Sequence, residues 1–101
     1  MSKNHDWSYE EVEYCAEEIF KSFVINRDYD YEILLDKLYI HFDMKIQKGS
    51  LKMFFSNQKG LFIENKIHNT LMISPLSNSS LSHRVAFKKL IEKYKELINE
   101  Q

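Results

Sequence analysis

Apolar side chains recur every three or four residues near the start of the chain, which is the period of an α-helix. These positions are Val12, Cys15, Ala16, Ile19, Phe20 and Phe23. Ser8 can cap such a helix, because Glu11 follows it by three residues in the pattern of a capping box. Trp7 and Val12 stand on either side of the cap at the positions of a hydrophobic staple. The pattern therefore predicts a first helix over about residues 8–25.

The same period returns in the second quarter of the chain and at its end. Asp30 can cap a second helix over about residues 30–42, with an apolar stripe at Ile33, Leu34, Leu38 and Phe42. A last helix over about residues 82–98 has its stripe at Phe87, Leu90, Ile91, Tyr94, Leu97 and Ile98. Residues 65–80 lack clear periodicity and contain Ser74-Pro75, which predicts a loop.

A third helix is predicted between these segments, over about residues 50–63. Ser50 follows Gly49 and is the expected cap. One face of this helix collects Leu51, Phe54, Phe55, Leu61 and Phe62. Gln58 falls within that apolar face, and Gly60 costs about 1 kcal/mol relative to alanine inside a helix. An early end of the third helix is therefore an open alternative.

Four helical segments and few turn residues predict a mostly α-helical fold. The chain has 101 residues, two glycines and one proline, and 44% of its residues are hydrophobic. This length suits one domain over residues 1–101, made of three helices, a loop and a C-terminal helix. We expect one core, formed by Trp7, Val12, Ile19, Phe23, Leu34, Leu38, Phe55, Phe62, Phe87, Leu90 and Ile91.

Charge is segregated along the chain, although the net charge is only −1. Residues 1–44 hold four basic and eleven acidic side chains, a balance of −7, whereas residues 45–90 hold eight basic and one acidic, a balance of +7. Segregation of this kind favours a molecule with one face attractive to an anion. The alternative is that the two halves fold together and neutralise each other, and the sequence leaves both open.

The residue types needed for catalysis or metal binding are sparse. Cys15 is the one cysteine, so a disulfide within the chain is excluded, and the polar start without an apolar signal core makes the cytoplasm the expected compartment. No apolar run approaches the roughly 20 residues of a membrane span. His5, His41, His68 and His83 are widely spaced and lie at no metal-ligand interval from Cys15. We therefore expect a non-enzymatic protein with no cofactor, no metal and no membrane partner.

The most informative segment for function is basic and includes the third helix. In helix-turn-helix domains the last of three helices enters the major groove, where lysines meet phosphates and an asparagine can pair with an adenine edge. A helix that is simply solvated on this side is the alternative. The candidate nucleic-acid-binding residues are Lys45, Lys48, Ser50, Lys52, Ser56, Asn57, Lys59 and Lys66.

Three short motifs resemble those of known proteins. Trp7-Ser8-Tyr9-Glu10-Glu11 resembles the W-[ST]-x-E-E opening of Myb- and SANT-like domains. The stretch from Gly49 to Lys59, together with Ser74-Pro75-Leu76-Ser77-Asn78, is similar to segments of small uncharacterised bacterial and phage proteins and of some restriction-type proteins. The chain departs from Myb repeats in having one tryptophan. The resemblance implies a three-helix core of the Myb or helix-turn-helix type and binding to DNA.

Two classes of function are therefore expected. The first is a small nucleic-acid-binding module, with DNA as the expected ligand. The second is a protein-binding inhibitor or adaptor of phage or mobile-element origin, which blocks a host defence or regulatory protein. Six tyrosines and seven phenylalanines offer anchors for the second. A homodimer through the final helix is compatible with both.

Overall fold

The computed structural model describes residues 6–27, 29–77 and 79–100, and it confirms the mostly helical prediction. The elements are α1 (Tyr9–Phe20), the π-helical turn η1 (Lys21–Asn26), α2 (Tyr31–His41), α3 (Lys48–Glu64), α4 (Leu81–Lys93) and α5 (Lys95–Asn99). These ranges contain no strand. None of their helices has the length and apolar character required to cross a membrane.

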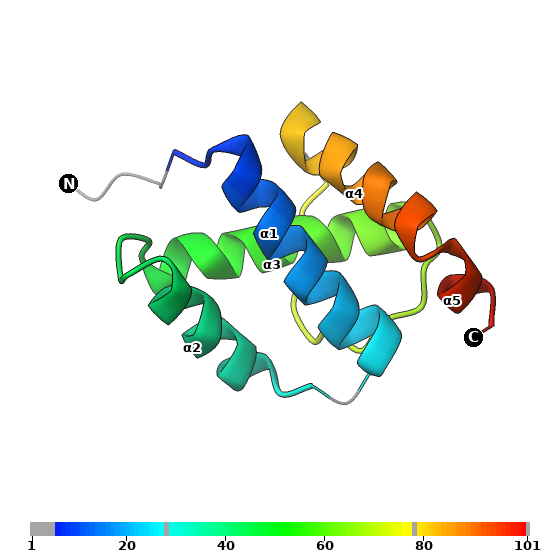
Figure 1. The fold of residues 1–101 in the computed structure, drawn as a ribbon, viewed down its shortest axis with the longest axis horizontal. Helices are drawn as coiled ribbons and strands as arrows, with labels where there is room; N and C mark the ends of the chain where they lie inside the picture. The colour runs from blue at the N-terminus through cyan, green and yellow to red at the C-terminus, as the bar shows by residue number, and fades with distance from the viewer. Residues whose placement is uncertain (1–5, 28, 78, 101) are drawn as a thin grey trace.

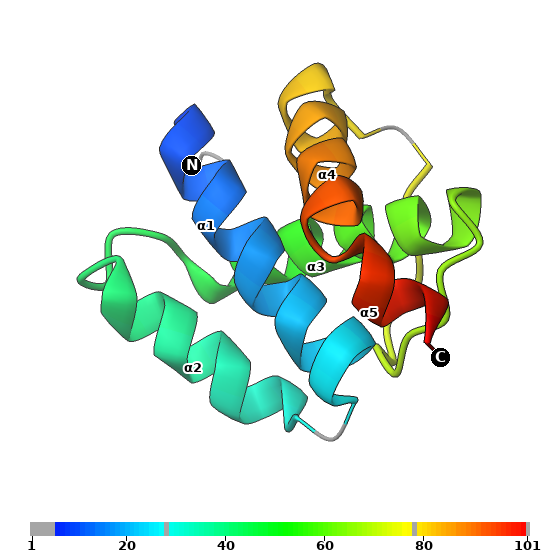
Figure 2. The same ribbon diagram turned by 45° about the vertical axis from the view of Figure 1, so that its right-hand side comes forward.

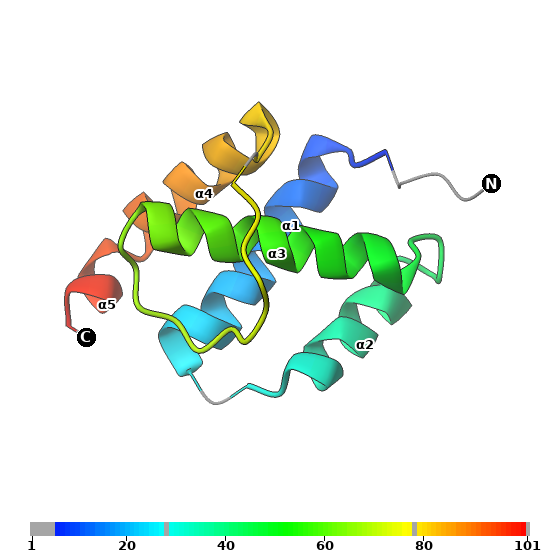
Figure 3. The same cartoon turned by 180° about the vertical axis from the view of Figure 1, so that it is seen from behind.

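α3 is the central element. α1 crosses one side of α3, and α2 and α4 flank α1 while also contacting α3 (Figures 1 and 2). On the opposite side, the loop that begins at residue 65 passes across α3 over residues up to 77 (Figure 3). α3 thus has neighbours on two opposite sides, which differs from a recognition helix lying open on the surface of a three-helix core.

The core is built around three phenylalanines contributed by three helices. Phe20 of α1 lies 6.0 Å from Phe62 of α3 and 5.6 Å from Phe87 of α4, measured between ring centroids. Phe62 and Phe87 are 5.4 Å apart. Each ring is at most 1% exposed, and aromatic pairs at such distances contribute about 0.5–1.5 kcal/mol beyond the area they bury. The expected core residues are confirmed as buried, except that Trp7 and Ile91 are half-buried and pack against the core.

The start of α1 confirms the predicted cap. The Ser8 hydroxyl accepts a hydrogen bond from the Glu11 backbone N–H, and the Glu11 carboxylate accepts one from the Ser8 backbone N–H at 2.9 Å. Trp7 packs on Phe54 of α3 at 4.7 Å and on Phe42 at 6.1 Å. The sequence motif at this point therefore fixes where α1 begins and how it meets α3.

The predicted first helix continues to Asn26, but its last turn widens into η1. The backbone N–H of Arg27 reaches the Ser22 carbonyl at 3.0 Å, which is a π-type hydrogen bond. The Phe23 carbonyl instead accepts from the Thr70 backbone N–H at 2.9 Å. The wider turn thus ties the long loop to the end of the first helical segment.

Three details of the predicted helices were wrong. α3 begins at Lys48 rather than Ser50, because the extended backbone of Gln47 provides the cap and its carbonyl accepts from Ser50 and Leu51. Ile33 is 60% exposed, since α2 contacts α3 through one edge and buries Leu34, Leu35 and Leu38. The final helix is interrupted at Tyr94, where α4 ends and α5 begins.

α3 runs through Gly60 without a break, and the loop packs against the helix at this glycine. The Leu76 backbone N–H donates to the Ser56 carbonyl at 3.0 Å, so the loop backbone lies directly on the helix. A Cβ atom built on Gly60 would lie 1.9 Å from the Leu76 carbonyl oxygen. Gly49, in the first turn of the same helix, has nothing within 4 Å of the corresponding position.

Alanine substitutions at these two glycines should act in opposite directions. Gly60→Ala forces the loop away from α3 and should lower the free energy of unfolding by roughly 1–3 kcal/mol, the usual cost of overpacking. Gly49→Ala meets no obstacle and should raise it by about 0.5–1 kcal/mol. Denaturant melts followed by circular dichroism measure both. An increase in stability for Gly60→Ala would contradict the contact between the loop and α3.

Candidate nucleic-acid interface

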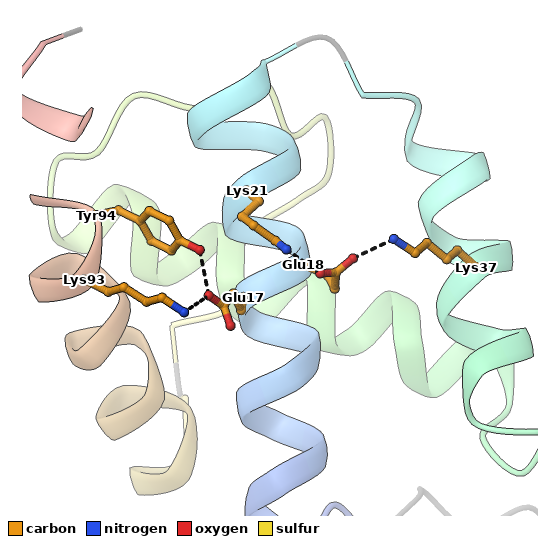
Figure 4. A network of polar contacts seen from close by, with 6 residues as sticks. All are labelled: Glu17, Glu18, Lys21, Lys37, Lys93 and Tyr94. Atoms are coloured by element: carbon orange, nitrogen blue, oxygen red, sulfur yellow. Dashed lines mark hydrogen bonds and ion pairs between the residues drawn. The ribbon is translucent and has the colours of Figure 1, made fainter. Parts of the chain in front are cut away.

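Two acidic residues of α1, Glu17 and Glu18, form ion pairs with lysines within the fold. Glu17 accepts hydrogen bonds from the Lys93 ammonium and from the Tyr94 hydroxyl, the latter at 2.6 Å (Figure 4). These two bonds lower the pKa of the Glu17 carboxyl. Burial, together with the bond to Glu17, raises the pKa of Tyr94 to about 12. Glu17 therefore fastens the junction of α4 and α5 to α1.

Glu18 makes the equivalent connection to α2. Its two carboxylate oxygens lie 2.8 Å from the Lys37 ammonium and 2.9 Å from that of Lys21 (Figure 4). Partial burial opposes ionisation of Glu18, yet the hydrogen bonds from Lys37 and Lys21 outweigh it and keep the pKa of this carboxyl below its ordinary value. The acidic side of α1 thus carries bound lysines along both of its flanks.

Other ion pairs join the acidic first half of the chain to the basic second half. Lys48 lies 2.6 Å from Asp36 and Lys89 lies 3.7 Å from Glu13. The two halves therefore neutralise each other in part, the alternative that the sequence left open. Such exposed pairs contribute at most about 1 kcal/mol each to the free energy of unfolding. Their importance here is that the lysines in these pairs are neutralised, so that only the other lysines are available to bind an anion.

Six lysines have no carboxylate partner among the described residues. Lys88 and Lys95 lie on α4 and α5, and the other four follow α3 and the turns at its two ends. Lys45, Lys52 and Lys66 are exposed, and their side chains make no ion pair or hydrogen bond within the described part of the chain. Lys59 is half-buried and donates to the Asn69 side-chain oxygen at 2.9 Å, so its charge is not neutralised. We refer to Lys45, Lys52, Lys59 and Lys66, which recur every seventh residue, as the lysine edge.

The remaining candidate residues are less available. Ser50 is 8% exposed within the first turn of α3, so we exclude it as a ligand-contacting residue. Lys48 is paired with Asp36, as described above. Ser56 and Asn57 are half-buried because the loop lies over them: their carbonyls accept from the Leu76 backbone N–H and from the Ser79 hydroxyl. The middle of α3 is therefore covered where a recognition helix would contact bases.

Sequence reasoning missed two basic residues beside Lys66. Arg27, at the end of η1, and His68, in the loop, line a surface pocket with Lys66. Nothing in the local periodicity joins these positions, since Arg27 lies in the turn after the first helical segment and His68 in the aperiodic loop. The one sequence signal is at Arg27, a basic residue just after a helix end, where glycine is usual.

Metal-ligating side chains do not gather among the described residues, and the one cysteine is buried. No cluster of three or more His, Cys, Asp or Glu side chains within these ranges could hold a metal ion. Cys15 is fully buried, and burial, together with the charges of Glu11 and Glu18, raises the pKa of its thiol, which disfavours the reactive thiolate.

Buried His83 should make the stability of the fold depend on pH. Its ring lies 4.4 Å from Phe54, its Nδ1 has no hydrogen-bond partner among the described residues, and burial lowers its pKa below the ordinary 6.5. At this position the unfolded chain takes up a proton more readily than the folded one. The free energy of unfolding is therefore highest above the ordinary histidine pKa, and it falls as the pH drops below that pKa. His83→Phe should flatten the dependence between about pH 7 and pH 5, measured by urea melts. A slope unchanged in that variant would assign the effect to other groups.

Searches against models of known protein families, curated protein sequences and solved structures find no match to this chain.

Proposed function

We propose that this protein binds the phosphate backbone of a nucleic acid, with duplex DNA as the expected ligand, through the lysine edge. The observation that carries the proposal is the distribution of charge after folding. Carboxylates of α1 and α2 neutralise Lys21, Lys37, Lys48, Lys89 and Lys93. The lysine edge is left without a carboxylate partner among the described residues.

The covered middle of α3 favours contact with phosphates over reading of bases. Phosphate contacts need exposed cations, and Lys45 and Lys52 satisfy this requirement near the N-terminal end of the helix. Base reading needs a helix face that fits into the major groove, and the Leu76 backbone lies on that face at Gly60. The binding should therefore depend strongly on salt and weakly on sequence.

Replacing exposed lysines of the lysine edge should change the salt dependence. Each neutralised phosphate releases counterions, so the double variant Lys45→Gln/Lys52→Gln should lower the slope of log affinity against log salt by about two. The measurement is fluorescence anisotropy with a labelled duplex at several salt concentrations. Both side chains are exposed and without partners in the described ranges, so the variant should fold normally.

The matched control is Lys88→Gln/Lys95→Gln, which removes the same charge from exposed positions on α4 and α5. It should leave the slope nearly unchanged. An equal loss of slope in both variants would show only a response to net charge and would refute the lysine edge as the contact surface. Asn57→Ala should leave any sequence preference intact, since the loop contacts this position.

A protein-binding role is the second candidate, and the outer side of α2 is the observation that favours it. Ile33 and Ile40 on α2 are 60% and 71% exposed, and Met44 in the turn after α2 is 66% exposed. Exposed apolar side chains that gather in this way are typical of an interaction surface. A co-purifying protein lost on Ile40→Ser, together with no duplex binding at low salt, would reverse the order of the two candidates. Sedimentation of the same variant tests whether this side joins two copies of the chain.

A further inference from the structure

A surface pocket of about 320 Å³ lies where the end of η1 meets the turn after α3. Its lining consists of Arg27, Lys66, Ile67, His68 and Ile98. Three of these side chains carry nitrogen donors, and two of them are permanently cationic at neutral pH. No carboxylate belongs to the described lining. The pocket therefore combines positive charge with two apolar walls.

Hydrogen bonds hold the two basic segments of the pocket together. Thr70 donates to the Phe23 carbonyl from its backbone N–H at 2.9 Å and from its hydroxyl at 3.4 Å. The Phe23 carbonyl lies one turn before Arg27, and Thr70 lies two residues after His68. Arg27 and His68, far apart in the sequence, are thereby kept beside each other in the folded chain.

The basic side chains of the pocket are not needed to cap the helices that precede them. The Lys66 backbone N–H donates to the Ile63 carbonyl at 3.1 Å, and the Ile67 N–H donates to the Phe62 carbonyl at 2.8 Å. The backbone N–H of Arg27 does the same for η1. These terminal carbonyls are thus satisfied by backbone groups. Within the described ranges, the side chains of the three basic residues make no hydrogen bond or ion pair.

The backbone at Arg27 and Lys66 would suit glycine better. Their φ angles are 65° and 56°, in the left-handed region where a side chain costs energy and glycine does not. Glycine is the usual residue at such positions after a helix. The chain places a guanidinium and an ammonium there instead, both at the rim of the same pocket.

We infer that this pocket binds a phosphate group. A guanidinium can bind two phosphate oxygens at once, an ammonium adds a point charge, and an imidazole N–H can donate to a third oxygen. Ile67 and Ile98 can contact the carbon atoms of an attached sugar. The phosphate can be free in solution or stand at the end of a nucleic acid. The second source rests on the proposed function, since Lys66 belongs to the lysine edge.

Glycine variants test the pocket without threatening the fold. Arg27→Gly and Lys66→Gly remove the cations while relieving the left-handed backbone, so the variants should fold at least as stably as the wild type. Inorganic phosphate is titrated into labelled protein, and backbone amide shifts are followed by NMR. The wild type should show saturable shifts around residues 27 and 66–68. Each variant should lose affinity about tenfold, because each removes a charge-assisted hydrogen bond.

Asp43→Gly and Met44→Gly are the matched controls. Asp43 and Met44 also have positive φ angles, of 55° and 58°, and lie outside the pocket. Their glycine variants should bind phosphate as the wild type does. Shifts that do not saturate, or an equal loss of affinity in these controls, would overturn the inference.

The source of the phosphate is decided by short DNA duplexes with either a 5′-phosphate or a 5′-hydroxyl at their ends. Tighter binding of the phosphorylated end, lost in Lys66→Gly, assigns the pocket to a nucleic-acid terminus. Equal binding of both, with saturable inorganic phosphate binding retained, assigns it to a free phosphate. If neither duplex binds at low salt while inorganic phosphate does, the pocket stands and the proposed function falls.

Discussion

The apolar face of α3 has to be buried, and the remaining elements are arranged to meet that constraint. α1, α2 and α4 cover it with side chains, whereas the loop covers it with backbone at Gly60. The enclosure extends to Gln58, which is fully buried with both amide atoms unpartnered among the described residues. An unsatisfied buried amide costs on the order of 1–3 kcal/mol, so the packing around α3 must be favourable enough to offset it.

The packing around α3 also determines which lysines are neutralised by carboxylates and which are not. The helices around it meet one another along α1, and there the acidic residues bind lysines from α2, α4 and the intervening segments. The side of α3 crossed by the loop meets backbone groups and the side chain of Asn69, which leave lysine charge uncompensated. A chain with a net charge of −1 can therefore present a basic surface.

The sequence predicted the helices well because their signals are local. The capping box at Ser8 and the phenylalanine spacing in α1, α3 and α4 depend on neighbouring residues, and the structure confirms them. The exposure of Ile33 and the pairing of Lys48 could not be predicted, because both depend on how α2 lies against α3. The pocket of Arg27 and His68 joins two segments through a long-range backbone contact that periodicity does not encode.

The motif that resembles the opening of Myb-like domains has a structural role in this chain. Ser8 and Glu11 cap α1, and Trp7 packs on Phe54 and Phe42. These roles belong to helix initiation and packing, and they would be the same in a helical domain of any function. The motif therefore supports the fold independently of the proposed ligand.

The loop after α3 has a fixed length as well as a fixed path. Thr70 is bound to Phe23, and Leu76 is bound to Ser56, so the five residues 71–75 have to span the distance between two anchored points. An added or deleted residue between these anchors would break one of them. Sequence relatives of this protein should therefore be recognisable by a loop of constant length.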